Sequence, residues 1–115
     1  MSRKIRKRIA AKPKVKARVF AALGDKTRLS IVARLCSGQP ASISQLADDS
    51  KLTRQAITKH LGVLERAGIV RSSQAGRERI FQFERAPIES LQQYLASVSK
   101  QWDQTLARLK SHVEK

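Results

Sequence analysis

The chain has 115 residues, enough for one small domain with a single core, and its apolar content of 41% is typical of a folded protein. Lys and Arg number 24 against 9 for Asp and Glu, which gives a formal net charge of +15. This excess indicates a polyanionic partner, first nucleic acid and second an acidic membrane surface. A single cysteine excludes an internal disulfide, and no apolar run approaches the roughly 20 residues of a membrane span. We therefore expect a cytoplasmic protein without a membrane partner.

Residues 1–14 form a basic segment that contains no acidic residue. Like-charge repulsion and the lack of an apolar face predict a flexible arm. Such an arm can follow phosphates or enter a minor groove, or it can simply aid solubility. We favour nonspecific contact with DNA.

Two helices are predicted next, over 15–23 and from about 26 to 36. Gly24 ends the first, and Asp25 caps the second with a negative side chain at its positive end. The apolar sides predicted for the two helices are Val15, Val19, Phe20 and Leu23, then Leu29, Val32, Leu35 and Cys36. We expect Cys36 to be a small buried core residue.

A helix-turn-helix is predicted over residues 42–68. Ser37 to Ala41 is a turn by composition. Either Ser42 or Ser44 can cap a short helix at about 45–49, and Ser42 with Gln45 also fits a capping box. The second helix runs from the cap Thr53 to Gly68, which can close it in the left-handed conformation. Its apolar stripe is Ile57, Leu61 and Leu64, and its other face carries Arg54, Gln55, Thr58, Lys59 and Arg66. A helix with this arrangement is suited to entering a major groove, although an amphipathic helix with a solvated polar face looks the same in sequence.

After Gly68 the pattern indicates a hairpin. The β-prone runs 69–73 and 79–84 flank a turn at 74–77, in which Gly76 is free to take a positive φ. Val70, Phe81 and Phe83 can face one side. Arg71, Arg77 and Arg79 are expected at or near the tip, so the hairpin can act as a wing that straddles a nucleic-acid backbone. The alternative is a plain surface hairpin.

A long last helix is predicted over 87–115, with Pro87 in its first turn. Its apolar residues recur in steps of three and four, close to a coiled-coil seam. A helix of about 26 residues spans roughly 39 Å, which exceeds the core available here. We therefore predict a two-fold dimer built on this helix and joined by the helix at 15–23. The predicted interface residues are Val19, Leu91, Leu95, Val98, Trp102, Leu106 and Leu109.

Three stretches resemble the arsenic-repressor (ArsR) family of bacterial regulators: ALGDKTRLSIVARL at 22–35, SISQLADDSKLTRQAITKHLGVLERAGIV at 42–70, and RSSQAGRERIFQF at 71–83. Lys26 stands where proline is common in the family. The resemblance implies a mainly α fold with a small β-hairpin wing, that is, a winged helix-turn-helix, and a homodimer through the terminal helices. It implies an arm at 1–14, a DNA-binding domain at 15–86 and a dimerisation helix at 87–115.

The resemblance also implies DNA-contacting residues. Gln55, Thr58 and Lys59 match groove-facing positions, where glutamine can pair with adenine, and lysine with guanine or phosphate. Phosphate contacts are expected from Lys51 and Arg54, and the wing arginines Arg71, Arg77 and Arg79 would reach the flanking minor groove or phosphates. His60 matches a family histidine, to which we assign packing and backbone contact.

The chain departs from the metal-sensing members of the family. The cysteine pair that many of them carry is absent at 41–46, and the last helix offers only Asp103, His112 and Glu114 for a zinc site. We predict no metal and no cofactor, and we leave open an unidentified small-molecule effector.

The favoured function is a sequence-specific regulator, a repressor that binds an imperfect inverted repeat in double-stranded DNA as a homodimer. The alternative is a nonspecific architectural protein of the nucleoid, which the net charge and the basic arm support. An enzyme is not expected, because no catalytic set and no phosphate-cradling glycine loop is found. A membrane-surface protein is disfavoured by the mixed charge on the last helix.

Overall fold

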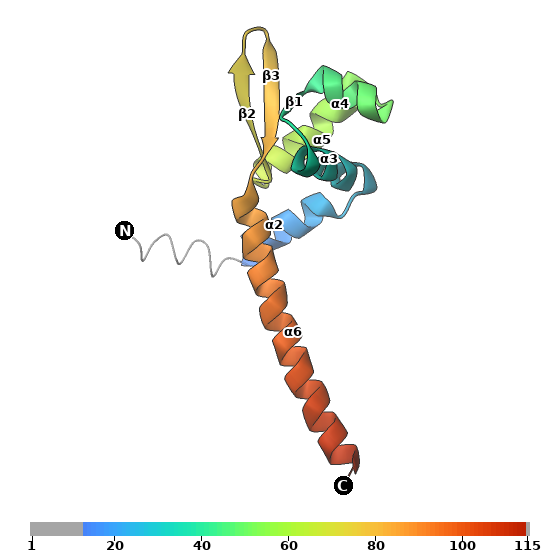
Figure 1. The fold of residues 1–115 in the computed structure, drawn as a ribbon, viewed down its shortest axis with the longest axis vertical. Helices are drawn as coiled ribbons and strands as arrows, with labels where there is room; N and C mark the ends of the chain where they lie inside the picture. The colour runs from blue at the N-terminus through green and yellow to red at the C-terminus, as the bar shows by residue number, and fades with distance from the viewer. Residues whose placement is uncertain (1–12, 115) are drawn as a thin grey trace, which may run out of the picture.

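The computed structural model describes residues 13–114, which form five helices and a small sheet (Figure 1). The basic arm predicted at 1–14 falls almost wholly outside these residues. The elements in chain order are α2 (Pro13–Leu23), α3 (Lys26–Ser37), β1 (Ala41–Ser42), α4 (Ile43–Ser50), α5 (Arg54–Arg66), β2 (Val70–Ala75), β3 (Glu78–Phe83) and α6 (Arg85–Glu114).

The core is organised around α5. Its stripe of Ile57, Leu61 and Leu64 is fully buried, as the 3.6-residue spacing predicts. Apolar side chains from every other described element pack with this stripe, including Ala41 of β1. The larger side chains of this core outside α5 are Val19, Ile31, Val32, Leu35, Leu46, Ile69, Val70, Phe81 and Leu91. Because this stripe is buried in the core, the polar face of α5 faces solvent.

The sheet has the strand order β1-β3-β2, and all its pairs are antiparallel. The predicted hairpin is confirmed: Val70 pairs with Phe83 at its base and Ala75 with Glu78 at its tip. Gly76 has φ 64° at the first position of the two-residue loop, where a glycine is needed. The strand β1 was not predicted. Ala41 and Ser42 are too short a run to carry an alternating pattern, and only their pairing with Phe81 and Ile80 makes them a strand.

The prediction for the buried side of α3 is wrong at two positions. Leu29 is 53% exposed and Cys36 is exposed, whereas Ile31 is buried beside Val32 and Leu35. Both stripes have helical spacing, and the packing against α5 and the sheet selects the one centred on Ile31. The prediction for α2 also needs correction, because Val15 and Phe20 are largely exposed while Val19 and Ala22 are buried.

The junction between α2 and α3 is closed by two side chains. Asp25 caps α3 and accepts a hydrogen bond from the Arg28 backbone N–H at 2.9 Å, as predicted from its position. This bond holds the pKa of the Asp25 carboxyl below its usual range. The Arg28 guanidinium reaches back to α2, where its Nε donates to the Ala22 carbonyl at 2.7 Å. The end of one helix and the start of the next are therefore satisfied together.

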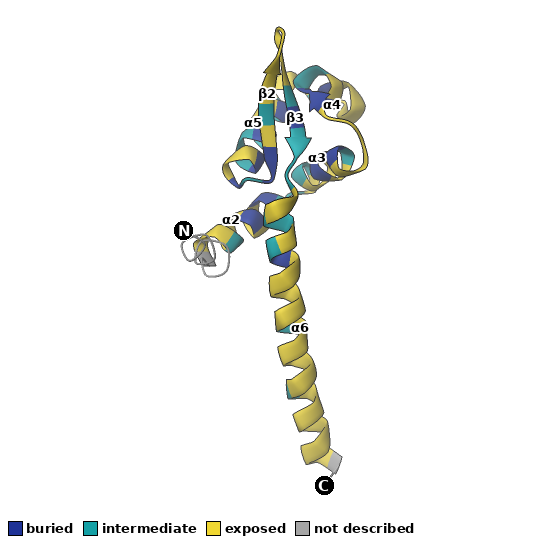
Figure 2. Cartoon of the chain, turned by 60° about the vertical axis from the view of Figure 1, so that its left-hand side comes forward, coloured by how far each residue is buried: buried dark blue, intermediate teal, exposed yellow. Residues whose placement is uncertain are grey.

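The helix α6 leaves the rest of the molecule soon after it begins. Its 30 residues correspond to about 45 Å, and the whole molecule measures 67 × 39 × 22 Å. Leu91 is buried, but beyond it most of the helix is exposed (Figure 2). No described helix is both long and apolar enough to cross a membrane.

Three predicted boundaries shift by a few residues. α2 begins at Pro13, so Lys14 belongs to a helix and not to the arm. α4 begins at Ile43, directly after its cap, and α6 begins at Arg85, which leaves Pro87 within the first turn. Each shift adds a turn or less at a helix end, where sequence patterns are weakest.

Candidate nucleic-acid interface

The helix-turn-helix is held by local capping. The Ser42 side chain accepts from the Gln45 backbone N–H at 3.2 Å, and the Gln45 side chain accepts from the Ser42 backbone N–H at 2.9 Å, which is the predicted capping box. Thr53 caps α5 through the Ala56 N–H at 3.0 Å. Between the two helices, Lys51 has φ 62°, a left-handed conformation that is uncommon for a side chain other than Gly, Asn or Asp.

The outer face of α5 presents polar side chains in its first two turns. Arg54, Gln55 and Lys59 are all exposed. Thr58 is exposed too, but its hydroxyl donates to the Arg54 carbonyl at 2.7 Å. In this rotamer Thr58 offers a methyl group and an oxygen acceptor to a partner, and not a donor.

The end of α5 directs the hairpin. Ile69 N–H donates to the Leu64 carbonyl at 3.0 Å and Gly68 N–H to the Glu65 carbonyl at 3.0 Å, while Gly68 has φ 78°. This is a Schellman ending, and the buried Ile69 supplies its apolar contact. The chain reverses there, so the hairpin of β2 and β3, residues 70–83, lies beside α5 as a wing (Figure 1).

A concavity of about 350 Å³ lies between the wing tip, the start of α4 and the start of α5. Its lining residues are Ser42, Ile43, Ser44, Arg54, Thr58, Arg77, Glu78 and Arg79. The structure thus brings Arg54 together with Arg77 and Arg79, which are more than 20 residues away in sequence. Ser42, Ile43, Ser44 and Glu78 were not predicted as site residues. Only the tertiary structure reveals their position, because the packing of the wing against α4 and α5 brings them to this concavity.

Arg71 is not at the tip of the wing, contrary to the prediction. It pairs with Gln82 near the base, and its Nε lies 3.0 Å from Oε1 of Glu84. Arg71 is the second residue of β2 and the turn follows the end of that strand, so only Arg77 in the loop and Arg79 near the start of β3 lie close to the tip. Arg71 remains exposed but has an acidic neighbour that offsets its charge.

His60 links α5 to the junction before α3. Its Nδ1 lies 3.9 Å from Oδ2 of Asp25, and its side chain is mostly buried. Among residues 13–114, no group of three or more His, Cys, Asp or Glu side chains is arranged to hold a metal ion.

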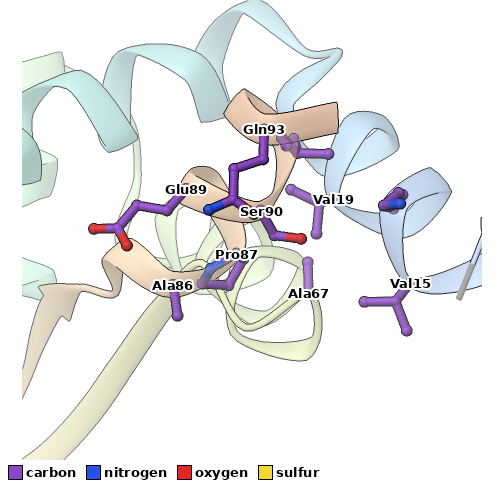
Figure 3. A pocket seen from close by; sticks show the side chains of 10 residues that line it. Val15, Val19, Ala67, Ala86, Pro87, Glu89, Ser90 and Gln93 are labelled. Carbon is purple, nitrogen blue, oxygen red and sulfur yellow. The ribbon is translucent and has the colours of Figure 1, made fainter. Parts of the chain in front are cut away.

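The predicted dimer residues divide into two sets. Val19 and Leu91 are buried within the chain itself, so they are already used by its own core. Leu95, Trp102, Leu106 and Leu109 are each more than half exposed, Val98 is half-buried, and Phe20 and Tyr94 add exposed aromatic rings that meet edge to face at 6.5 Å. A hollow of about 350 Å³ adjoins this face between α2, the end of α5 and the start of α6, with Val15, Val19, Ala67 and Pro87 in its wall (Figure 3).

Comparison with known proteins identifies the class. A family model described as a helix-turn-helix domain matches residues 23–73. An ArsR-like transcriptional regulator from Rhodococcus sp. RHA1 superposes with a TM-score of 0.77 at 37% identity, over 85% of this chain and 92% of that one. The homodimeric winged helix-turn-helix DNA-binding domain of Mb0332 from Mycobacterium bovis has the same fold, with a TM-score of 0.62 at 22% identity over 73% and 80% of the two chains. The chain is a winged helix-turn-helix DNA-binding regulator.

The family follows from the closer relatives. The HTH-type transcriptional regulator YuzN from Bacillus subtilis (strain 168) is 39% identical over 79 residues, which are 64% of this chain and 86% of YuzN. With the Rhodococcus structure, this places the chain in the ArsR family of transcriptional regulators, as its sequence patterns predict. The relatives reported above are named as regulators of transcription.

Proposed function

We propose that this protein is a sequence-specific repressor that binds an imperfect inverted repeat as a homodimer. The observation that carries the proposal is the face of α5. Its apolar stripe is fully buried, and its exposed N-terminal half carries Gln55 beside Lys59. The cationic side chains attract phosphates of any sequence, whereas Gln55 adds base selectivity. Its amide can pair with both N6 and N7 of adenine in the major groove.

The remaining roles follow from position. Lys59 contacts guanine or phosphate, and the Thr58 methyl group can lie against a thymine methyl, because its hydroxyl proton is held by the helix. Arg54 and Arg77 line the concavity between α5 and the wing and bind the phosphates of the strand that passes through it. Lys51 contacts a phosphate from the turn before α5.

Self-association is supported by the exposed face of α6. A row of large apolar side chains more than half exposed is unusual on a monomer, and each gains about 1.5–3 kcal/mol when buried. A second copy of α6, together with α2, covers this face and the adjoining hollow (Figure 3). The homodimeric state of the Mycobacterium bovis domain supports self-association. Two recognition helices one turn of DNA apart then match an inverted repeat.

The nonspecific alternative is separated from this proposal by a titration. The net charge of +15 alone would give affinity for any duplex. A duplex recovered by the protein from a random-sequence pool is compared with a scrambled duplex of the same composition, at low and physiological salt. We expect the recovered duplex to bind at least about tenfold more tightly at physiological salt. A smaller ratio, or failure of the pool to converge on a motif, contradicts the repressor and supports the architectural protein.

Lys51→Gly should separate folding from DNA binding at one residue. The left-handed conformation costs a lysine about 1–2 kcal/mol and costs glycine almost nothing, while glycine loses about 0.5–1 kcal/mol more entropy on folding. We expect unchanged or slightly higher stability in thermal melts, with weaker DNA binding and a salt-dependence slope lower by about 1 for each protomer. Lys51→Asn should behave similarly, because asparagine tolerates this conformation. An unchanged salt slope in both variants contradicts the phosphate contact.

A further inference from the structure

Three side chains from three elements form a chain of hydrogen bonds at the side of α5. Ser72 of β2 donates from its hydroxyl to Oε2 of Glu65 on α5 at 2.7 Å. Arg79 of β3 donates from Nε to the same Ser72 oxygen at 3.0 Å. The hydroxyl therefore lies between an anion and a cation, and each of its bonds is charge-assisted. We call these three residues the wing tie.

The wing is held unequally on its two strands. β3 is the central strand, and β1 supports it at Phe81 and Ile80. β2 is an edge strand with a neighbour on one side only. Its first residue, Val70, is buried, but from Ser73 to Ala75 it is exposed. A two-stranded ribbon in water is marginally stable and free to twist, so the edge strand beyond its base needs a further contact.

Ser72 provides that contact. It is two residues beyond the buried base of β2, and Glu65 is the next-to-last residue of α5, so the wing tie joins the C-terminal end of the helix to the edge strand. A contact at this point restricts the angle between wing and helix, and with it the width of the concavity that Arg54 and Arg77 both line.

We propose that Glu65 and Ser72 are positioning residues for DNA binding, which act by holding the wing where Arg77 meets the backbone beside the half-site. The proposal rests on the wing contact described under Proposed function. Arg79 has a share in the same role, since its Nε–H is used within the protein and not on DNA.

Because Glu65 is negatively charged, the direction in which its removal changes DNA affinity tests the proposal. An acidic side chain close to a DNA-binding face repels phosphates, so by charge alone its removal strengthens binding to every duplex. Positioning predicts the opposite for any duplex long enough to reach the wing. Loss of the wing tie weakens binding to such a duplex and leaves binding to a shorter duplex unweakened.

The experiment compares two duplexes built on the half-sites recovered by selection. The short duplex ends at the half-sites, and the long one extends about 10 base pairs beyond each. The wild-type protein should bind the long duplex more tightly, and Arg77→Ala should remove that advantage. Ser72→Ala should lose about threefold to tenfold in affinity for the long duplex and nothing for the short one. Glu65→Ala should weaken binding to the long duplex although it removes a negative charge.

Matched variants complete the design. Ser73→Ala removes a hydroxyl from the neighbouring exposed position of the same strand, outside the wing tie, and should behave like the wild type. Ser72→Thr keeps the hydroxyl on a strand-favouring side chain and should restore the long-duplex advantage. If Ser72→Ala keeps that advantage while Arg77→Ala loses it, the positioning role is wrong and the wing contact stands. If Arg77→Ala keeps it, the wing contact itself is wrong and the positioning role falls with it.

Discussion

Replacing Gln55 and Lys59 together by alanine should abolish the preference for the recovered duplex over a scrambled one. Each good pairing with a base edge is worth about 1–3 kcal/mol of discrimination, so the loss of two corresponds to about thirtyfold or more. Both side chains are exposed on α5, and neither is part of the buried stripe of Ile57, Leu61 and Leu64. Alanine is also a good helix former. Helicity and the melting temperature should therefore change little.

The comparison needs a pair of the same residue types elsewhere. Lys100 and Gln104 have the same spacing of four on α6 and are both exposed. Their replacement by alanine removes the same charge and the same amide from the protein. It should lower affinity slightly and equally for both duplexes, through net charge alone. If the Gln55 and Lys59 variant keeps its selectivity in a fluorescence-anisotropy titration, sequence reading resides elsewhere in the molecule.

Replacing Trp102 and Leu106 by glutamate should give a monomer with much weaker DNA binding. Both side chains are more than half exposed in the single chain, at 61% and 55%, so their replacement leaves no cavity in the core. In a dimer they would be buried, and four carboxylates would replace them. Once the two recognition helices are no longer linked, each half-site binds alone and the avidity of about 10²–10⁴ is lost. Sedimentation equilibrium reports the oligomeric state directly.

The opposite face of α6 provides the control for added charge. Ser97 and Gln104 are exposed and lie away from the apolar row by helical spacing. Their replacement by glutamate adds the same two negative charges per chain and should leave the dimer intact. A dimer that survives the Trp102 and Leu106 changes would show that the two copies associate through another surface. If the monomeric variant bound DNA with the affinity of the wild type, the inverted-repeat model would be wrong.

Much of the fold could be predicted because its signals are local. The capping of α4 by Ser42, of α5 by Thr53 and of α3 by Asp25 depends on side chains within three residues of the group they satisfy. The stripe of α5 and the turn at Gly76 are likewise contained in a few consecutive residues. Such patterns are readable in sequence because the physical partners are neighbours in sequence.

The sequence by itself determined the order of the helices and the hairpin, the exposed polar face of α5 and the approximate length of α6. Only the tertiary structure decided which of two apolar stripes α3 buries, why Cys36 and Leu29 stay exposed, and why Arg71 lies beside Glu84 at the base of the wing. It also made Ala41 and Ser42 a strand, and it joined Glu65 to Ser72. The reason is the same in each case. These outcomes depend on partners brought together by the packing of α5 against the sheet, and helical or strand periodicity carries no information about which partner a face will meet.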